Sequence, residues 1–565
     1  MATADAIVKK IIAGISGGTA LIGIQFSASY LPALAGTDVP INFALLVGLT
    51  IVVATLGGLL SAIHPWVCGL ALVLLSVPGF SIPNIGAGLI CGTLVPVLAQ
   101  RLRPSVVVLV LGLGHLAWRI PKQPVPTETH EDPRPDIVLV VLDTVSASRT
   151  SLHGFELETT PNLDALAAAG AWFVRAQSPA PWTMPAHAAM FTGQDPRDVG
   201  VHHEHLTLSA TVPTTAELLT DAGYQTGAFL ANPWLRRESG LTRGFSHTEG
   251  LWEIIDANRS FSILNLVDAK PGKGGAALVR RGLDFLRTQT QPSFVVFNLL
   301  EPHAPYHMTP NAQYFGAENP AEVSARVLAQ QALGPDANSY PETGELEAAM
   351  RVHAAGIRDV DALLGEIWHA LQARSRASVL IVTSDHGEGF GEHDIHGHIV
   401  GLWPETLHVP LVVVAPGIIE PNTIIHEAVS TKQVHGTILS MASQPSGPGL
   451  FDPSGSRPIS EHFRPLVFLN RFGGRARHPQ FDVEASKIHG ETHTLLVSKD
   501  ANNQATWQCF DIRTDPMERT PLPVTECDRT LQTDLMAHRQ RPTPRENPSL
   551  PMHAQEQLRA LGYIE

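Results

Sequence analysis

Several polar residues in this sequence come directly after apolar runs, and their types are those that bind metal ions. Asp143 follows the run DIVLVVL, His303 follows SFVVFNLLEP, and Asp385 and His386 follow SVLIVTS. Thr183 stands where a loop meets a helical segment, in WTMPAHAAMFTG. Carboxylate oxygens and imidazole nitrogens together suit zinc, manganese, magnesium or calcium. If these side chains converge, they form a site for a divalent cation with one hydroxyl beside it.

Each of these residues also has an ordinary structural explanation. An aspartate after a strand commonly caps a helix or stabilises a turn, and a threonine before a helix is commonly its N-cap. His393, His396 and His398, in GEHDIHGHIVG, fit a solvated loop. The polar residues that follow the apolar runs are more informative together than singly, because a single edge of one sheet would bring all of them together.

The segments around these residues alternate between strand and helix patterns. The runs at 136–142 and 378–383 are short, apolar and mostly β-branched, as in strands that are buried on both faces. Between them, the helical segments TPNLDALAAAGAWF and TTAELLTDAGY alternate with the strand-like segments QTGAFLA and SFVVFNLLEPH. This order is typical of βαβ units around a mostly parallel sheet, which binds ligands at the carboxyl ends of its strands. The soluble part is therefore expected to be α/β.

Residues 1–120 have the pattern of an all-α transmembrane region of about five helices. The apolar stretches lie at about 11–33, 42–63, 66–80, 83–100 and 104–118. Basic residues precede the first stretch and separate the fourth from the fifth, which places everything after residue 120 on the extracytoplasmic (periplasmic or extracellular) side. A cleavable signal peptide is the alternative, but further apolar runs follow the first one.

The proline-rich segment 121–135 is expected to be an extended linker. Residues 1–122 carry a net charge of +4 and the remainder −18, which gives −14 overall. Nucleic acid is not expected as a partner, because the sequence has no dense basic patch. Of the four cysteines, Cys509 and Cys527 could pair in an oxidising compartment.

Seven segments, taken in order, resemble the sulfatase family of the alkaline phosphatase superfamily. They are LVVLDT, WTMPAHAAMFTG, EPHAPYH, TSDHGEGFGEH, GHIVGLWPETLHVPLVVVAPG, CFDIRTDPMER and LRALGYIE. The resemblance covers about residues 135–565 and implies an alkaline-phosphatase-like α/β sandwich with a large mixed sheet between helices. It implies a catalytic domain over 136–445, followed by a small C-terminal subdomain with a short antiparallel sheet over 446–565.

The same resemblance implies roles for individual residues. Asp143, Asp385 and His386 match metal-ligand positions. Thr183 matches the nucleophile, which also contacts the metal. His303 and His398 match positions that bind the anionic group of the substrate or a second metal.

The sequence departs from the family pattern at the nucleophile. Sulfatases carry Cys or Ser in a Cys/Ser-x-Pro-x-Arg motif and oxidise it to formylglycine, whereas this chain has TMPAH, with His187 in place of the arginine. Oxidation of threonine gives a ketone instead of an aldehyde, so Thr183 cannot become formylglycine. Two roles are open for His187: it orients Thr183 or protonates a leaving group, or it makes only a structural hydrogen bond.

A second departure follows the first strand. Many sulfatases have another acidic ligand there, and this chain has Ser146 and Ser148. A site with fewer carboxylates either holds its metal less tightly or takes a ligand from another residue, of which His393 and Asp394 are the nearest candidates.

Other polar residues are assigned outside the metal site. Glu388 is expected to contact the metal ligands instead of the metal, and Lys487 is a candidate for an anion contact. Four histidines in polar stretches are expected on the surface: His153, His202, His203 and His205.

An unmodified threonine is the nucleophile of phosphodiesterases and of phosphoglycerol or phosphoethanolamine transferases in the superfamily that the sequence resembles. Coordination to a divalent cation lowers the pKa of the hydroxyl and presents an alkoxide to phosphorus. Water or an acceptor alcohol can then resolve a phosphothreonine, whereas a sulfothreonine lacks the exit that formylglycine provides. These considerations favour a membrane-anchored hydrolase or phosphotransferase for an anionic ester, such as a lipid head group or an envelope glycan.

Two other functions remain open at this point. One is a sulfuric ester hydrolase that works without formylglycine. The other is a catalytically inactive family member that acts as a binding or scaffold protein, which the departures at Ser146, Ser148 and His187 would suit. Joint retention of the metal-ligand set and the hydroxyl argues against inactivity.

Overall fold

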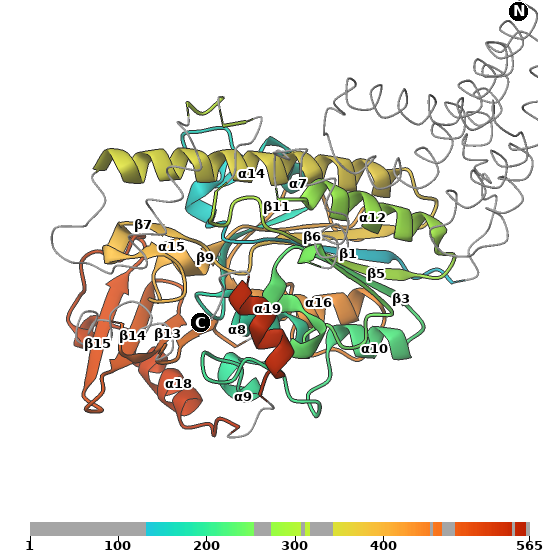
Figure 1. Cartoon of the computed structure of the whole chain (residues 1–565). Helices are drawn as coiled ribbons and strands as arrows, with labels where there is room; N and C mark the ends of the chain where they lie inside the picture. The colour runs from blue at the N-terminus through green and yellow to red at the C-terminus, as the bar shows by residue number, and fades with distance from the viewer. Residues whose placement is uncertain are drawn as a thin grey trace, which may run out of the picture. The chain divides into compact units, whose positions relative to one another are not determined.

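Figure 1 shows the computed structural model of the chain. The described residues are 132–252, 273–306, 311–312, 314–316, 343–452, 456–465, 481–544 and 549–560. The predicted transmembrane region, 1–120, and residues 121–131 of the predicted linker lie outside them. Of the helices in the described ranges, none has the length and apolar character that crossing a bilayer requires.

A mixed sheet forms the centre of the described structure. Its central strands β1 (Asp136–Leu142), β5 (Ser293–Leu299) and β6 (Ser378–Thr383) are parallel to one another. The other strands are β2 (Ala171–Gln177), β3 (Gln225–Leu230), β4 (His247–Gly250), β9 (His408–Val409), β10 (Leu411–Val414) and β11 (Thr423–Ser430). The order is β11-β2-β10-β6-β1-β5-β3-β4, with β9 paired to β2. Because β10 runs antiparallel to β2 and β6, the sheet is mixed, as the resemblance implied.

Strand β1 is apolar after its first residue because helices cover both faces of the sheet (Figure 1). Alternate residues of β1 pack in one core with α7 (Pro161–Ala169), α12 (Gly275–Thr288) and α14 (Thr343–Gln372). The intervening residues pack in the second core with α8 (Thr183–Thr192), α10 (Thr215–Asp221), α16 (Val434–Met441) and α19 (Met552–Ala560). Burial on both faces fixes the carboxyl end of β1 rigidly.

The predicted helix over TPNLDALAAAGAWF is wrong at its end. Helix α7 stops at Ala169, and Ala171 begins β2. Gly170 forms the junction, and it lies so close to β10 that a Cβ atom there would be 2.2 Å from the carbonyl oxygen of Val413. The aromatic residues Trp172 and Phe173 therefore pack as part of the sheet, where their β propensity suits them.

A smaller antiparallel sheet follows in the chain, as the resemblance implied. It has the order β12-β13-β14-β15, from β12 (Ile459–His462), β13 (Glu484–His489), β14 (His493–Lys499) and β15 (Ala505–Asp511). Helix α18 (Arg529–Arg539) packs on it. Cys509 and Cys527, whose pairing the sequence left open, form a disulfide with their Cα atoms 6.0 Å apart.

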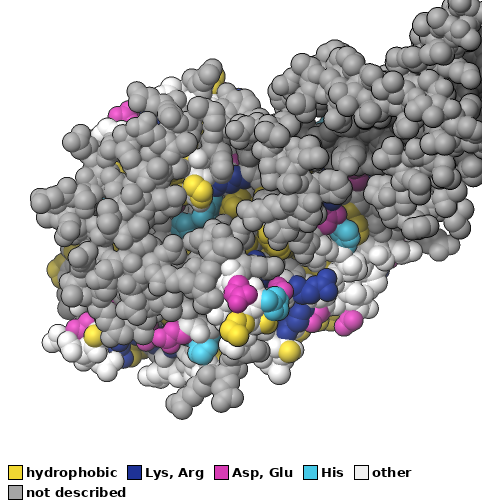
Figure 2. Space-filling model, viewed as in Figure 1, with side chains coloured by type: hydrophobic (Ala, Val, Ile, Leu, Met, Phe, Trp, Pro, Cys, Tyr) yellow, Lys and Arg dark blue, Asp and Glu magenta, His cyan; other side chains and the backbone are white. Residues whose placement is uncertain are grey.

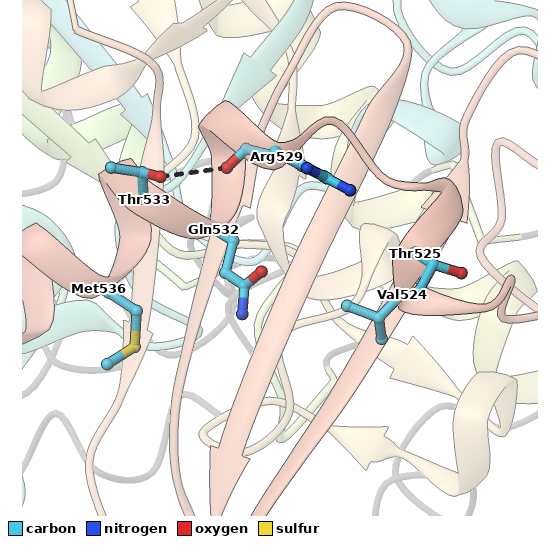
Figure 3. A pocket seen from close by; sticks show the side chains of 6 residues that line it. All are labelled: Val524, Thr525, Arg529, Gln532, Thr533 and Met536. Carbon is cyan, nitrogen blue, oxygen red and sulfur yellow. Dashed lines mark hydrogen bonds between the residues drawn. The ribbon is translucent and has the colours of Figure 1, made fainter.

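The remaining described α-helices and β-strands are short. They are α9 (Pro196–Val199), α15 (Pro404–Leu407), and the strand pair β7 (Gly389–Phe390) and β8 (His396–Gly397). On the face seen in Figure 2, basic, acidic and histidine side chains lie intermixed among the described residues. A surface hollow lies beside α18 (Figure 3), lined by Val524, Thr525, Arg529, Gln532, Thr533 and Met536. It contains neither a carboxylate nor an imidazole and none of the predicted site residues.

The contact at Gly170 predicts a stability difference between two glycine substitutions. Gly170→Ala should destabilise the chain by about 1–3 kcal/mol, because the new methyl group meets the backbone of β10. Gly447→Ala is the matched control, since a Cβ at that position has no atom within 4 Å, and its effect should stay within about 0.5 kcal/mol. Thermal and urea unfolding of the detergent-purified chain measure both. Equal stability of the two variants would contradict the close approach.

Candidate metal centre and active site

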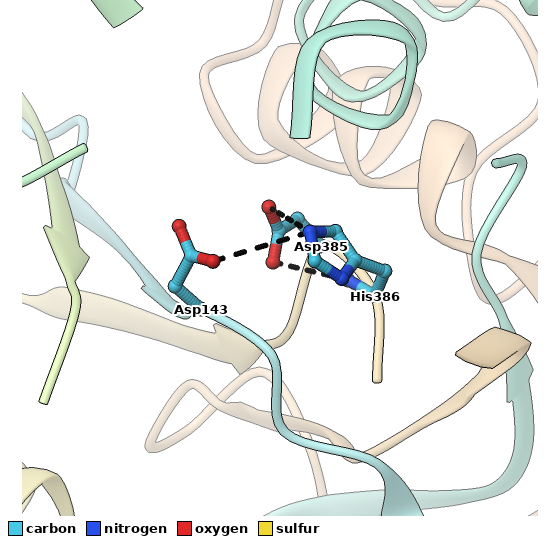
Figure 4. Close-up of side chains that lie close together, drawn as sticks. All are labelled: Asp143, Asp385 and His386. Carbon is cyan, nitrogen blue, oxygen red and sulfur yellow. Dashed lines mark hydrogen bonds and ion pairs between the residues drawn. The ribbon is translucent and has the colours of Figure 1, made fainter. Parts of the chain in front are cut away.

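Two neighbouring strands bring Asp143, Asp385 and His386 together. Asp143 directly follows β1, and Asp385 and His386 come just after β6, which pairs with β1 in parallel register. One ligand atom from each of the three lies within 4.8 Å of the others (Figure 4). All three side chains are fully buried. The carboxyl ends of the two strands thus form a single three-residue cluster, as expected for ligands at this edge of a sheet.

The hydrogen bonds of these residues leave one atom of each directed at the cluster. Asp143 Oδ1 and Asp385 Oδ2 are buried and make no hydrogen bond within the described part of the chain. His386 donates from Nδ1 to the carbonyl of Gly387 at 3.0 Å, so Nε2 carries the lone pair of the neutral ring. Nε2 lies 3.4 Å from Asp385 Oδ2 and 4.0 Å from Asp143 Oδ1. Two carboxylate oxygens and the Nε2 lone pair in this arrangement fit a divalent cation.

The electrostatics of the two carboxylates also fit a cation. Burial and the nearby Asp143 charge raise the pKa of Asp385 well above its usual range. Burial opposes ionisation of Asp143 as well, but His303, His386 and two asparagine amides outweigh it and lower the pKa of Asp143. Adjacent buried carboxylates resist joint ionisation unless a positive charge lies between them.

Two asparagines hold Asp143 from the side opposite its free oxygen. Asn232, which follows β3, donates from Nδ2 to Asp143 Oδ2 at 2.8 Å. Asn298, within β5, donates to the same oxygen at 3.1 Å. Together they orient the carboxylate and leave Oδ1 facing Asp385 and His386.

Thr183 is the first residue of α8, and its hydroxyl lies at the cluster. Its oxygen is 3.3 Å from His386 Nε2 and accepts a hydrogen bond from Asn232 Nδ2 at 3.2 Å. The N-cap position belongs to Trp182, so Thr183 does not cap the helix with its side chain. The N-terminal end of α8 gives this position a positive potential that favours an anion.

His187, one helical turn after Thr183, contacts the backbone and the cluster. Its Nδ1 lies 3.0 Å from the carbonyl oxygen of Thr183 and 3.4 Å from Asp385 Oδ2. Burial lowers the pKa of His187 to about 4, so the imidazole is neutral near pH 7. The Nδ1 contact is with the backbone carbonyl of Thr183 and not with its hydroxyl.

His303 and His398 lie beside His386. The ring of His398 is 4.6 Å from that of His386 and 4.9 Å from that of His303, measured between centroids. Glu388, which is buried, lies 3.2 Å from His398 Nδ1 and accepts a hydrogen bond from Tyr306 at 3.1 Å. Glu388 thus contacts His398 and does not belong to the three-residue cluster.

Lys273 adds a positive charge near these imidazoles. Its Nζ donates a hydrogen bond to the carbonyl oxygen of His303. Burial lowers the pKa of Lys273 to about 8, against the opposing effects of Glu301, Asp143 and Glu388. A cation on this side of the cluster suits an anionic substrate.

The residues proposed to replace a missing acidic ligand do not lie at the cluster. His393 bonds through Nδ1 to Glu405 at 3.0 Å and stacks on Trp403 at 4.2 Å between ring centroids. Asp394 is exposed. Neither residue belongs to the three-residue cluster of the described structure, so the prediction for these two residues is wrong.

Two other sequence predictions are also corrected. Lys487 is buried, where it pairs with Glu518 and donates to the carbonyl of Leu402 at 3.0 Å, so it does not serve as an anion contact. His203 is only 3% exposed and stacks on Trp182 at 4.4 Å, although its neighbours in sequence are polar. His153, His202 and His205 are each partly buried and not fully at the surface.

Sequence reasoning missed Asn232, Asn298, Lys273 and Tyr306. A signal was present for the two asparagines. Asn232 comes just after the apolar segment QTGAFLA, in the same position relative to a strand as Asp143, and Asn298 is a polar residue inside the apolar run SFVVFNLL. Lys273 and Tyr306 carry no comparable signal, because loop paths decide where they lie.

The chain is similar to known proteins over most of its described part. A family model described as Sulfatase matches residues 135–444. Arylsulfatase K of Canis lupus familiaris is 23% identical over 427 residues, which cover 68% of this chain and 78% of that protein.

Solved structures are similar in fold to this chain over most of its length. The phosphonate monoester hydrolase of Agrobacterium radiobacter matches with a TM-score of 0.55 and 21% identity, covering 72% of this chain and 94% of that one. A protein solved with its substrate D-glucosamine-2-N,6-O-disulfate has a TM-score of 0.55 and 16% identity, covering 73% of this chain and 100% of that one. At these identities the two likenesses bear on the fold alone, which is alkaline-phosphatase-like.

The cluster predicts a cation-dependent gain in stability. MnCl₂ or ZnCl₂ should raise the melting temperature of the wild-type chain, and a concentration of 100 times the dissociation constant corresponds to about 2.7 kcal/mol. Asp385→Asn should abolish most of this gain. Asp361→Asn is the matched control, because Asp361 is another buried aspartate that instead accepts hydrogen bonds at the start of α7. An unchanged response in Asp385→Asn would argue against the assigned ligands.

Proposed function

From the premise that the chain belongs to the sulfatase family of the alkaline phosphatase superfamily and is a hydrolase of that family, we propose that it hydrolyses or transfers a phosphate-ester group, or a related sulfate-ester group, through Thr183. The observation that carries this proposal is the position of the Thr183 hydroxyl. The hydroxyl oxygen lies 3.3 Å from Nε2 of His386, a member of the three-residue cluster, and accepts a hydrogen bond from Asn232.

The residues of the cluster have the role of holding a cation. Asp143 and Asp385 each present an oxygen without a hydrogen bond in the described structure, and His386 presents the Nε2 lone pair beside them. A divalent cation bound there supplies a Lewis acid that lowers the pKa of a nearby hydroxyl and neutralises charge on the transferred group. The neutral His187 holds the first turn of α8 against Asp385, which keeps Thr183 at the cluster.

The remaining groups near the cluster suit the substrate. Thr183 attacks the phosphorus or sulfur atom from the N-terminal end of α8, where negative charge is stabilised. His303, His398 and Lys273 offer cationic or hydrogen-bonding groups to the anionic ester and to its leaving group. These are the positions that the family resemblance gives to substrate contacts, with Lys273 added by its place beside His303.

Phosphorus is favoured over sulfur because of the second step. A phosphothreonine can be attacked by water or by an acceptor alcohol, and Thr183 then leaves as an alkoxide. A sulfothreonine lacks the hemiacetal route by which formylglycine expels sulfate. The sulfate-ester alternative has support of its own, since the curated relative is an arylsulfatase and one structural neighbour has a sulfated sugar as substrate.

The proposed substrate is an anionic ester outside the cytoplasm, on a lipid head group or an envelope glycan. The apolar stretches in residues 1–120 and their flanking basic residues support a membrane anchor with this orientation. The Cys509–Cys527 disulfide is consistent with an oxidising compartment. A disulfated sugar in one structural neighbour supports an anionic glycan as the substrate class.

The inactive-scaffold alternative has less support. A buried carboxylate oxygen without a hydrogen bond destabilises a fold, so a chain without catalysis gains nothing by retaining Asp143 Oδ1 and Asp385 Oδ2 side by side. The hydroxyl of Thr183 and its asparagine contact also remain in place.

Turnover of aryl esters tests the proposal. The detergent-purified chain, supplied with Mn²⁺ or Zn²⁺, is assayed with bis(4-nitrophenyl) phosphate, 4-nitrophenyl phosphate and 4-nitrophenyl sulfate. A phosphoester should be turned over, and Thr183→Ala should lower the rate by about 10³-fold or more because the nucleophile is lost.

Thr192→Ala serves as the control for the threonine substitution. Thr192 lies on the same helix and donates only to the carbonyl of Ala188, so its removal should leave turnover nearly unchanged. Sulfate turnover that depends on Thr183 would favour the sulfatase alternative. Failure on all three esters, with no cation bound, would favour the scaffold.

A further inference from the structure

Asn232 uses every polar group of its side chain within the candidate site. Its Oδ1 accepts a hydrogen bond from the backbone N–H of Trp234 at 3.0 Å, which caps the 3-10 turn Pro233–Leu235. Its Nδ2 donates to Asp143 Oδ2 at 2.8 Å and to Thr183 Oγ1 at 3.2 Å. Its backbone N–H donates to Asn298 Oδ1 at 2.9 Å. The side chain is fully buried, so these bonds are shielded from water.

These partners fix the orientation of the amide. The N–H of Trp234 can only donate, so the amide atom that faces it is the oxygen. The two hydrogens of Nδ2 are then divided between Asp143 and Thr183. The Thr183 oxygen therefore receives a hydrogen bond in place of giving one to Asn232.

We propose that Asn232 is a catalytic residue, which stabilises negative charge on the Thr183 oxygen whenever that oxygen becomes an alkoxide. This inference rests on the proposed function of Thr183 as the nucleophile. An amide donor that is already in place costs no reorganisation when the charge develops.

Negative charge develops on the Thr183 oxygen in both steps of the reaction. In the first, the hydroxyl loses its proton to solvent, the oxygen forms a bond to phosphorus, and the bond to the leaving alcohol breaks with its electron pair. That alcohol takes up a proton from water. In the second, water adds to phosphorus and loses a proton to solvent, and the electron pair of the Oγ1–P bond returns to Oγ1, which is reprotonated. Asn232 faces Oγ1 at both moments.

Comparison with Asn298 distinguishes two roles for Asn232: stabilising charge on the Thr183 oxygen, and orienting Asp143 in the cation site. Both asparagines donate to Asp143 Oδ2, at 2.8 Å from Asn232 and 3.1 Å from Asn298. Only Asn232 donates to Thr183. Replacing each with serine thus removes one hydrogen bond to Asp143, and only Asn232→Ser also removes the bond to the nucleophile. Serine keeps a hydroxyl that can accept from Trp234 N–H, so the cap at residue 232 is retained.

Two measurements on the detergent-purified chain distinguish these effects. Mn²⁺ titration followed by electron paramagnetic resonance gives the cation affinity, which both variants should weaken by a similar factor of about 10. Rapid mixing with bis(4-nitrophenyl) phosphate at saturating Mn²⁺ gives the rate constant of the first 4-nitrophenolate release. Asn232→Ser should slow this step by about 10-fold or more relative to Asn298→Ser, because only the first substitution also removes the hydrogen bond to the Thr183 oxygen.

The outcomes separate failure of this inference from failure of the proposed function. If wild-type turnover requires Thr183 but the two serine variants have equal rate constants at saturating Mn²⁺, Asn232 acts only through Asp143 and the inference is wrong. If wild-type turnover does not require Thr183, the proposed function itself fails, and the inference fails with it. Melting curves of both variants establish folding, and Asn232→Ala provides a second variant if the serine does not fold.

Discussion

The mutual repulsion of two buried carboxylates governs the architecture of the site. Asp143 and Asp385 stand at the carboxyl ends of the adjacent parallel strands β1 and β6, and each keeps one oxygen without a hydrogen bond within the described structure. Burial and proximity favour the neutral form of one of them, which shows in the raised pKa of Asp385. A cation held by these two carboxylates would remove this penalty. The hydrogen bonds that Asn232 and Asn298 donate to Asp143, and the one that His386 donates through Nδ1, orient the three ligand side chains toward one point.

One of these donors, Asn232, also contacts Thr183, which by resemblance matches the position of the residue that becomes formylglycine in sulfatases. A threonine hydroxyl is a poor nucleophile in water, and α8 brings this one to the cluster at its N-terminal end. Asn232 donates to the hydroxyl oxygen and His187 ties the backbone carbonyl of the same residue. Both contacts hold the hydroxyl oxygen of Thr183 beside Asp143, Asp385 and His386. His187, whose imidazole is neutral, stands where the family motif has an arginine.

The ends of buried strands were the part of the site that the sequence could predict. Asp143, Asp385 and His386 each follow a strand whose apolar pattern is unambiguous, so their convergence follows from parallel pairing alone. Contacts between residues far apart in the sequence cannot be predicted from local sequence patterns. Lys487 has a charged partner 31 residues away, and His203 lies among polar neighbours yet stacks on Trp182. The end of α7 depends on the close approach of Gly170 to β10. The helical periodicity of the segment itself does not predict this approach. His393 contacts Glu405 and Trp403 instead of the cluster, and its proximity in sequence to the metal-ligand positions does not reveal these contacts.

The central claim is that Thr183 forms a covalent bond to the transferred group. The most direct measurement is tandem mass spectrometry of the chain after it is mixed with bis(4-nitrophenyl) phosphate and Mn²⁺, quenched in acid and digested. The account predicts a nitrophenylphosphoryl group on the peptide that contains TMPAH, with fragment ions that assign it to Thr183. Release of 4-nitrophenolate with the group on another residue, or with no covalent adduct at any time after mixing, would contradict the account.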